Sequence, residues 1–224
     1  MDVSEAVIKR QSIRAFKPDP IPVEILKKIM ETALRVPSSG NSQPCEYAVV
    51  SGEKLTEIKQ SVLACLSQMP RPDIPAPMEY PEPWRSRYVA LMRGVQDKLG
   101  ITREDRAKRA EWNTWGMRLW GAPCCIYIII DKNLYNAAES ANLFNIFDCG
   151  MATQTIMLLA TEQGLGTIPA LMPVLYPDVL RKALGLPENK LFVIGIPIGY
   201  PDWNHPANSF RSSREPLDKM VKFY

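Results

Sequence analysis

The fold of this chain depends on one uninterrupted apolar run, Cys124-Cys125-Ile126-Tyr127-Ile128-Ile129-Ile130. A continuous run of this length, rich in β-branched residues, is typical of a strand that is buried on both faces. Residues 191–200 have the same character, and residues 46–51 form a further strand candidate that Gly52 ends. The sequence therefore predicts a small sheet built from few strands.

Most of the remaining chain has helical periodicity. The predicted helices span residues 3–9, 22–35, 54–69, 84–99, 102–120, 137–163 and 177–184. The helix at 137–163 is apolar on most faces and is stopped by Gly164, so it has to be covered on most sides, and a partner subunit is one candidate cover. These elements predict an α+β or mixed α/β fold in a single domain of residues 1–224.

The composition is that of an ordinary globular protein, with 46% hydrophobic and 23% charged residues. A net charge of +3 without a Lys/Arg block does not favour nucleic acid as a partner. Residues 1–12 lack a secretory signal, and the apolar stretches at 122–130 and 191–200 are too short to span a bilayer, so no membrane partner is expected. Five cysteines without C-x-x-C spacing indicate reduced thiols and a cytoplasmic protein.

The chain has a single histidine, His205, in the loop-like context Asn204-His205-Pro206. No G-x-S-x-G elbow accompanies it, which argues against a Ser-His-Asp hydrolase, and zinc sites with two or three histidines are excluded. The glycine signatures of dinucleotide-fold dehydrogenases and P-loop enzymes are missing as well. No metal site is predicted, and if the protein is an enzyme, a cofactor does its chemistry.

Three segments are candidates for binding a ligand. In an extended segment Arg10, Ser12 and Arg14 project to the same side, and two guanidinium groups beside a hydroxyl form a receptor for phosphate or carboxylate. The polar loop at 37–44 (PSSGNSQP) offers amides that can read the edge of a flat heterocycle. Residues 164–171 (GLGTIPAL) suit a tight backbone laid against a ligand. Each segment also has an explanation without a ligand. The arginine segment is then solvated surface, the polar loop is a capped turn, and residues 164–171 are a helix C-cap and turn.

The order of these segments resembles that of the FMN-dependent nitroreductase family. The resemblance rests on R-x-S-x-R-x-F at 10–16, P-S-S-G-N-S-Q-P at 37–44, G-L-G-T at 164–167 and the basic motif R-S-S-R-E-P-L at 211–217. It runs from end to end of the chain and implies an α+β fold, in which helices surround a central mixed sheet, and an intertwined homodimer.

The same resemblance implies an oxidoreductase that takes hydride from NADPH or NADH and passes it, through flavin N5, to a nitroaromatic, a quinone or a similar electron-poor small molecule. The residues that would bind FMN are Arg10, Gln11, Ser12, Arg14, Ser38, Ser39, Asn41, Gln43, Pro169, Ala170, Leu171, Arg211 and Arg214. Two other functions fit the resemblance too. One is a reductive dehalogenase or flavin-modifying enzyme, and the other is a flavin-binding redox sensor or store without turnover.

Each group of these residues has an implied role. Arg10, Ser12 and Arg214, with help from Arg211, would hold the phosphate. Arg14 would lie near N1 and O2 of the ring, where its charge favours the reduced flavin. The serine, asparagine and glutamine side chains of the polar loop would reach the flavin of the partner subunit. The segment 169–171 would lie against the ring, with a backbone N–H at N5.

The resemblance is weakest at about 67–120, a variable segment that would form a lid or a substrate wall. Six prolines between residues 70 and 83 exclude helix and central strand there, so this part is either an ordered surface connection or a lid. Its aromatic residues either stack on flat acceptors or belong to the core. They are Tyr80, Trp84, Tyr88, Trp112, Trp115 and Trp120.

The chain also departs from the family pattern at three places. Cys45 stands where many relatives have tryptophan, and Ala170 and Leu171 stand where many have an acidic residue. Ser212 replaces a lysine of some relatives, which leaves open whether Arg211 or Arg214 holds the phosphate.

Overall fold

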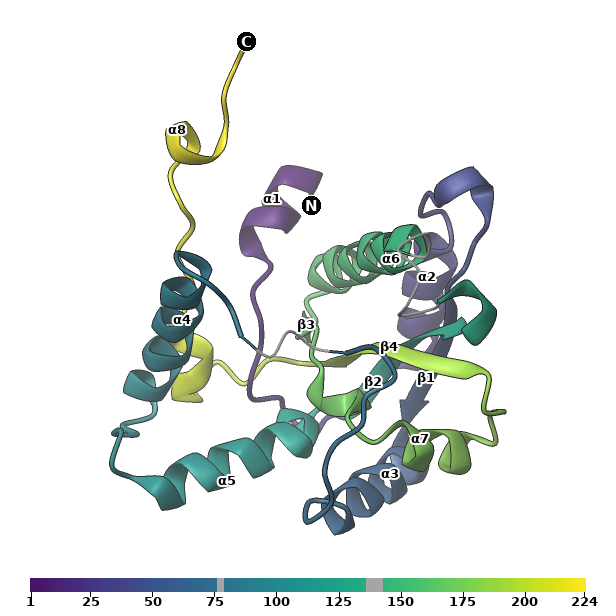
Figure 1. Ribbon diagram of the computed structural model, residues 1–224, viewed down its shortest axis with the longest axis horizontal. Coiled ribbons are helices and arrows are strands. Elements are labelled where there is room, and N and C mark those ends of the chain that lie inside the picture. Colours follow the sequence, from purple (N-terminus) through teal and green to yellow (C-terminus); the bar gives the residue numbers. More distant parts are fainter. Residues whose placement is uncertain (76–78, 136–142) are drawn as a thin grey trace.

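The computed structural model describes residues 1–75, 79–135 and 143–224 (Figure 1). A four-stranded sheet in the order β1-β2-β4-β3 occupies its centre. The strands are β1 (Glu46–Ser51), β2 (Cys124–Asp131), β3 (Gly166–Thr167) and β4 (Lys190–Gly199). All the ladders are antiparallel, and the one parallel pairing among the described residues is an isolated bridge between Ser12 and Thr167. The predicted α+β class is confirmed, and the mixed character of the sheet is limited to that bridge.

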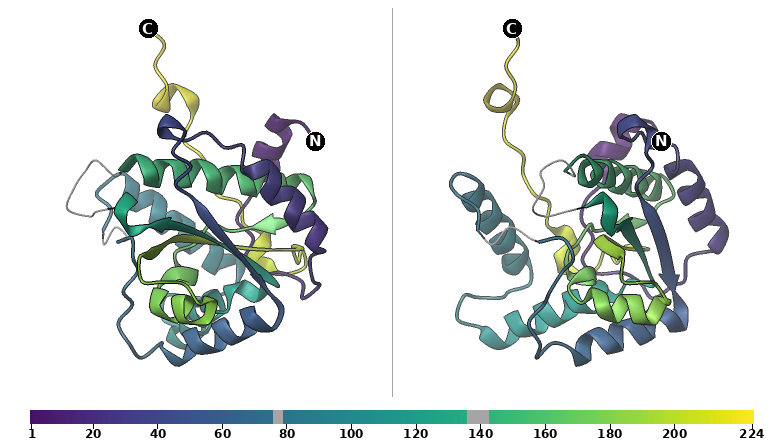
Figure 2. Two further views of the ribbon diagram at one scale, coloured as in Figure 1. Left: turned by 90° about the vertical axis from the view of Figure 1, so that its right-hand side faces the viewer. Right: turned by 45° about the vertical axis from the view of Figure 1, so that its right-hand side comes forward.

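Helices cover both faces of this sheet (Figure 2). The α-helices of the described residues are α1 (Val3–Lys9), α2 (Val23–Ala33), α3 (Gly52–Ala64), α4 (Trp84–Lys98), α5 (Arg106–Met117), α6 (Leu143–Glu162), α7 (Pro177–Leu184) and α8 (Leu217–Met220). Of these, α8 lies in the carboxy-terminal tail, away from the sheet (Figure 1). α2 and α6 share one apolar layer with the sheet, and α3, α5 and α7 lie on the opposite side. The central position of β2 explains this arrangement, because a strand paired on both edges and apolar on both faces needs two covers.

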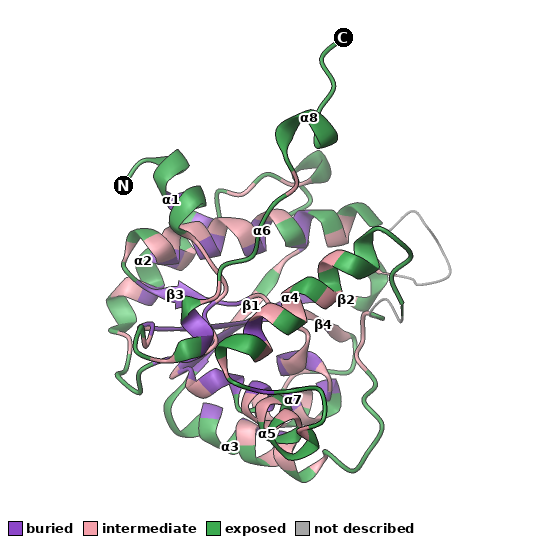
Figure 3. Cartoon of the chain, turned by 90° about the vertical axis from the view of Figure 1, so that its left-hand side faces the viewer, coloured by how far each residue is buried: buried purple, intermediate pink, exposed green. Residues whose placement is uncertain are grey.

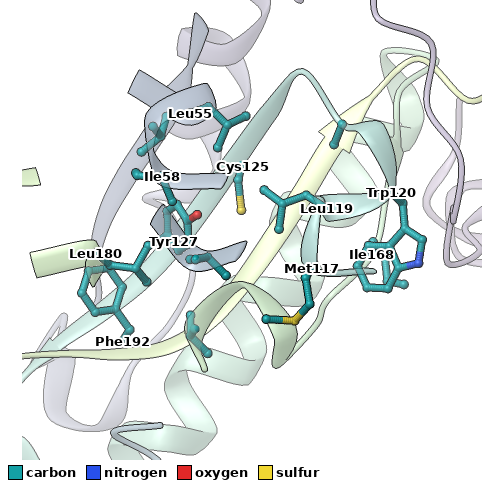
Figure 4. Packing of buried hydrophobic residues seen from close by; sticks show 14 of the residues in the cluster. Leu55, Ile58, Met117, Leu119, Trp120, Cys125, Tyr127, Ile168, Leu180 and Phe192 are labelled. Carbon is teal, nitrogen blue, oxygen red and sulfur yellow. The ribbon is translucent and has the colours of Figure 1, made fainter. Parts of the chain in front are cut away.

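The run at 124–130 is buried along its whole length, as predicted. Because successive side chains of a strand point to opposite faces, this one strand contributes to both apolar layers. Figure 4 shows the layer on the side of α3 and α7, where the rings of Tyr127 and Phe192 meet edge to face at 5.7 Å between centroids.

The predicted helices are present, with differences at their ends. α3 ends at Ala64, and the prediction that it reaches 69 is wrong. α5 begins at Arg106 rather than at 102, because the side chain of Asp105 caps it by accepting a hydrogen bond from the Lys108 amide at 3.0 Å. The expected start of the long helix at 137 lies outside the described residues. α8 and the short strand β3 were not predicted, since each is too short to show periodicity.

α6 is the one helix in the described part of the chain that is long and apolar enough to cross a membrane. One side of it packs on the sheet and on α2, as in the core helix of a globular protein. Its first turns are exposed (Figure 3), and the large side chains of Leu143, Phe144 and Phe147 are 64%, 67% and 64% accessible. The prediction that this helix needs an additional cover therefore applies to its amino-terminal end.

The start of the proline-rich segment is attached firmly to the body of the molecule. Asp73 Oδ2 accepts hydrogen bonds from the Arg181 guanidinium at 2.8 Å and from the Phe192 amide at 2.9 Å. The side chains of Asp73 and Arg181 are only 10% and 12% exposed. Tyr176 also donates its hydroxyl to the Gln68 carbonyl at 3.2 Å. This part of the segment is thus an ordered connection.

Replacing Asp73 by alanine is expected to lower the free energy of unfolding by about 2–4 kcal/mol, because it leaves a buried guanidinium and a buried amide without their acceptor. Asp178 is a matched control, since it binds the same Arg181 but its side chain is 93% exposed. Asp178→Ala should cost less than about 1 kcal/mol. Urea unfolding measures both values, and equal losses would contradict the role assigned to Asp73.

Candidate functional site

Residues from both ends of the chain line one cavity of about 580 Å³, which we call the arginine cavity. The predicted residues that line it are Arg10, Gln11, Ser12, Arg14, Arg211 and Arg214. Nearly two hundred positions separate the two groups in the sequence, and the fold places them together because the carboxy-terminal segment runs beside the segment that follows α1 (Figure 1).

The arginine cavity has a surplus of positive charge. Among the described residues, no carboxylate lies within 4.0 Å of its four guanidinium groups. Burial lowers the pKa of Arg10, and the charges of Arg214 and Arg211 lower it further. Burial alone lowers the pKa of Arg14. Arginine still remains protonated at neutral pH, so the cavity is poised for an anion with several acceptor oxygens.

Close packing holds the segment that carries Arg10 and Arg14. The Ile13 amide donates to the Thr167 carbonyl at 3.0 Å, and the Ile13 side chain is buried, opposite to its polar neighbours as predicted. A Cβ on Gly166 would lie 2.5 Å from the side chain of Ile13, so only glycine fits there. Gly164 follows α6 with φ of +73° and ends that helix. These two glycines therefore serve the helix end and the packing, rather than direct contact with a ligand.

Asn208 is a buried residue that fixes Arg14, and the sequence did not indicate it. Its Oδ1 accepts from the Arg14 amide at 2.7 Å, and its Nδ2 donates to the carbonyls of Ala15 and Asp202, each at 2.8 Å. The indole of Trp115 donates to the Arg14 carbonyl at 3.1 Å. The backbone of Arg14 is thus held at both its amide and its carbonyl, which restricts where its guanidinium can reach.

A second, larger cavity of about 910 Å³ adjoins the arginine cavity, and Gln154 of α6 lines both. We call it the aromatic cavity, because the rings of Tyr80 and Tyr88 lie in its wall with 5.8 Å between their centroids. Leu171 also lines it. A flat ring fits such a space, so the two cavities together suit a molecule with an anionic end and an aromatic end.

Residues 7–200 match the family model described as the Nitroreductase family. The chain belongs to the nitroreductase family. The chain is 30% identical to 4-nitrobenzoate reductase of Pseudomonas putida over 231 residues, which cover 99% of this chain and 95% of that protein.

Two solved structures of family members are also similar. The FMN and NADPH-dependent nitroreductase NfnB from Sphigopyxis sp. strain HMH has a TM-score of 0.91 and 30% identity, covering 100% of this chain and 99% of that one. The FMN-dependent nitroreductase NfnB from Mycobacterium smegmatis, in complex with NADPH, has a TM-score of 0.90 and 27% identity, with both chains covered completely. The resemblance and the fold that it implied are confirmed.

In this family member, the segment 169–171 has one free amide for a ligand. Pro169 has no N–H, and Ala170 exchanges both backbone hydrogen bonds with Gly195, at 2.9 and 3.2 Å. The amide of Leu171 has no acceptor among the described residues. Leu171 is also the residue of the three that lines the aromatic cavity, so it is the candidate for the N–H expected at N5.

The polar loop at 37–44 lines neither cavity of its own chain. It contains a short 3₁₀ turn, Ser39–Asn41, and its conformation is unusual because Asn41 and Gln43 have φ of +56° and +48°. The Gln43 amide donates to Ser38 Oγ at 2.9 Å, and the Ser39 amide donates to the buried carboxylate of Asp148 at 3.1 Å. The loop is thus held in shape, and within one chain it does not meet the arginines.

The structure decides between the two alternatives for three of the tryptophans. Trp120 belongs to the core, and Trp115 and Trp112 pack against it, as the structural alternative predicted.

Gln154 is a further residue that the sequence analysis missed. The available signal was a polar amide within a helix that is otherwise apolar on most faces.

Proposed function

We propose that this chain is an FMN-dependent reductase that takes hydride from NADPH or NADH and reduces nitroaromatic or similar electron-poor small molecules. The observation that supports it best is the joined pair of cavities, one with uncompensated arginines and the other with aromatic and apolar walls. The relatives described above include a 4-nitrobenzoate reductase and FMN-dependent enzymes.

The residues present fit FMN by charge and by shape. Arg10, Arg211 and Arg214 supply three cations for the phosphate, whose dianion would relieve their mutual repulsion. Ser12 adds a hydroxyl in the same wall. Both carboxy-terminal arginines line the cavity, so we assign the phosphate to the two of them together with Arg10.

When bound, FMN supplies the hydride chemistry between the nicotinamide and the acceptor. The protein contributes position and charge. Arg14, which lines the arginine cavity, would supply a cation that stabilises the negative charge of the reduced flavin, and the Leu171 amide in the aromatic cavity would be free to donate a hydrogen bond to the ring. A general base from histidine is not required, and the Nδ1 of His205 already accepts a hydrogen bond from the Ala207 amide at 3.2 Å.

We further propose that two chains form the intertwined homodimer of the family and that the protein acts in the cytoplasm. In the dimer the polar loop of each chain would reach the flavin held by the other. The exposed Phe144 and Phe147 of α6 and the exposed tail that ends in Phe223 and Tyr224 are apolar surfaces of the kind that a partner covers. The tail extends away from the body of the molecule (Figure 1), which is the arrangement expected of a segment that packs on a second subunit. Reduced cysteines and a nicotinamide donor suit the cytoplasm.

Removal of residues 217–224 is expected to weaken the dimer, because it deletes the exposed apolar side chains of the tail. Analytical ultracentrifugation at micromolar concentration should show a dimer for the full chain and a larger monomer fraction for the shortened one. The double variant Phe223→Ser, Tyr224→Ser keeps most of the tail and should have a smaller effect. A full-length chain that sediments as a monomer would refute the dimer.

The function is tested by colour and turnover. The purified protein should be yellow, should bleach under anaerobic conditions with NADPH or NADH, and should regain its colour on addition of nitrofurazone or menadione. Failure of both nucleotides to bleach it would favour the redox sensor or store. Bleaching followed by halide release from a halogenated phenol, without reduction of nitro compounds, would favour the dehalogenase. In each case we propose that the segment at about 67–120 forms the variable wall of the site.

A further inference from the structure

Two cysteines that are distant in sequence meet at the base of the polar loop. Cys45 precedes β1 and directly follows Pro44 at the end of the loop, whereas Cys149 lies in the amino-terminal half of α6. Their Sγ atoms are 3.3 Å apart and both thiols are free. Cys149 is 1% exposed and also borders the aromatic cavity, and Cys45 is half-buried.

The surroundings favour reaction of this pair over the other thiols. The hydrogen bond between the two thiols lowers the pKa of Cys45, although burial opposes this effect. The same hydrogen bond and burial raise the pKa of Cys149, so Cys45 is the thiol of the pair that forms the thiolate. By contrast, burial raises the pKa of Cys124 to about 12, and burial also raises the pKa of Cys125. Cys65 is half-buried at the end of α3 but has no second cysteine beside it.

Metal binding does not explain the pair. A stable site for a soft metal ion needs three or four ligands. Within the described ranges, no group of three or more cysteine, histidine, aspartate or glutamate side chains could hold a metal ion. Two thiols at this separation are instead arranged for oxidation, since a disulfide requires the sulfur atoms to move together by only about 1 Å.

We propose that Cys45 and Cys149 form an oxidation site, at which a peroxide converts the two thiols into a disulfide that fastens the polar loop to α6. The Cys45 thiol loses its proton, and its thiolate attacks one oxygen of hydrogen peroxide. The O–O bond breaks, and the leaving hydroxide takes up that proton, so a sulfenic acid and water result. The Cys149 sulfur then attacks the Cys45 sulfur as the S–O bond breaks, the proton of the Cys149 thiol joins the leaving hydroxide, and a second water leaves with the S–S bond formed. Two thiols are oxidised by two electrons, and one peroxide is reduced to two waters.

The disulfide would attach both ends of the polar loop to the same helix. The loop already binds α6 at its start, where the Ser39 amide donates to Asp148. The bond between Cys45 and Cys149 would add a covalent attachment at its end, one residue further along α6. This consequence rests on the proposed function: the loop that would reach the partner's flavin would be held in one position under oxidising conditions.

The experiment uses the purified full-length protein with FMN bound, treated with a small excess of hydrogen peroxide and then denatured and alkylated. The number of free thiols should fall from the five of the sequence to three, and peptide mass spectrometry should find Cys45 joined to Cys149. Dithiothreitol should restore all five. In Cys149→Ser the disulfide should be absent and dimedone should label Cys45, whereas Cys65→Ser, the matched control, should form the disulfide as the parent chain does.

Three results would overturn the proposal: five thiols after treatment, loss of thiols spread over Cys65 as well, or separate alkylation of the two peptides. The thiol count does not depend on flavin, and the same treatment of the protein stripped of FMN should yield the same disulfide. A protein that binds no FMN but forms the disulfide would therefore refute the proposed function and leave the oxidation site standing.

Discussion

Arg10→Ala is expected to weaken FMN binding by roughly 10- to 100-fold. A charge-assisted hydrogen bond to a phosphate contributes about 1.5–3 kcal/mol, and each 1.4 kcal/mol corresponds to a factor of ten in affinity. Arg10 lines the arginine cavity with Arg211 and Arg214, and after burial it is the charges of Arg214 and Arg211 that lower its pKa, so its guanidinium lies near both of them. Titration of the apoprotein with FMN, followed by flavin fluorescence, measures the change.

Two further variants serve as controls for the expected loss of FMN affinity in Arg10→Ala. Arg35→Ala removes an exposed arginine at the end of α2 that lines neither cavity, and it should leave FMN affinity unchanged. Arg10→Lys keeps the charge but loses the paired donors, so its affinity should fall between those of the parent and Arg10→Ala. If Arg10→Ala bound FMN as tightly as Arg35→Ala, the phosphate would have to lie elsewhere.

The second large effect is expected for Arg14→Ala, in the rate of flavin reduction rather than in retention of FMN. Removing one electrostatic contact to charge that develops in a reaction typically slows it by about 100-fold. The bound flavin should also become harder to reduce, by about 30 mV for each 1.4 kcal/mol of lost stabilisation in a two-electron couple. Stopped-flow reduction with NADPH and a redox titration measure the two quantities.

Arg10→Ala and Arg14→Ala therefore have opposite profiles. The first should lose FMN and, when saturated with it, be reduced at nearly the parent rate, whereas the second should keep FMN and be reduced slowly. Arg14→Lys retains a cation and should recover part of the rate. Equal losses of affinity and rate in both alanine variants would contradict the division of roles between the two arginines.

Local patterns in the sequence were sufficient to predict much of the fold. The strand at 124–130, the helix at 177–184 and the placement of Arg10, Ser12 and Arg14 opposite to Ile13 follow from periodicity over a few residues, and the structure has all three. The helix ends were less predictable. α5 is capped by Asp105 and not by Thr102, because one hydrogen bond from the Lys108 amide fixes where the helix begins. The periodicity of the apolar residues does not show which residue makes that bond.

The sequence by itself determined that a sheet is buried at the centre, that arginines occur at both ends of the chain and that the family is that of the nitroreductases, since each depends on residue type and spacing along the chain. Only the tertiary structure decided which residues meet. Asn208 holds Arg14, Gln154 joins the two cavities, and Cys45 lies beside Cys149 across more than one hundred positions. These contacts arise where helices and strands pack across the sheet, and packing of distant segments leaves no periodic signal in either of them.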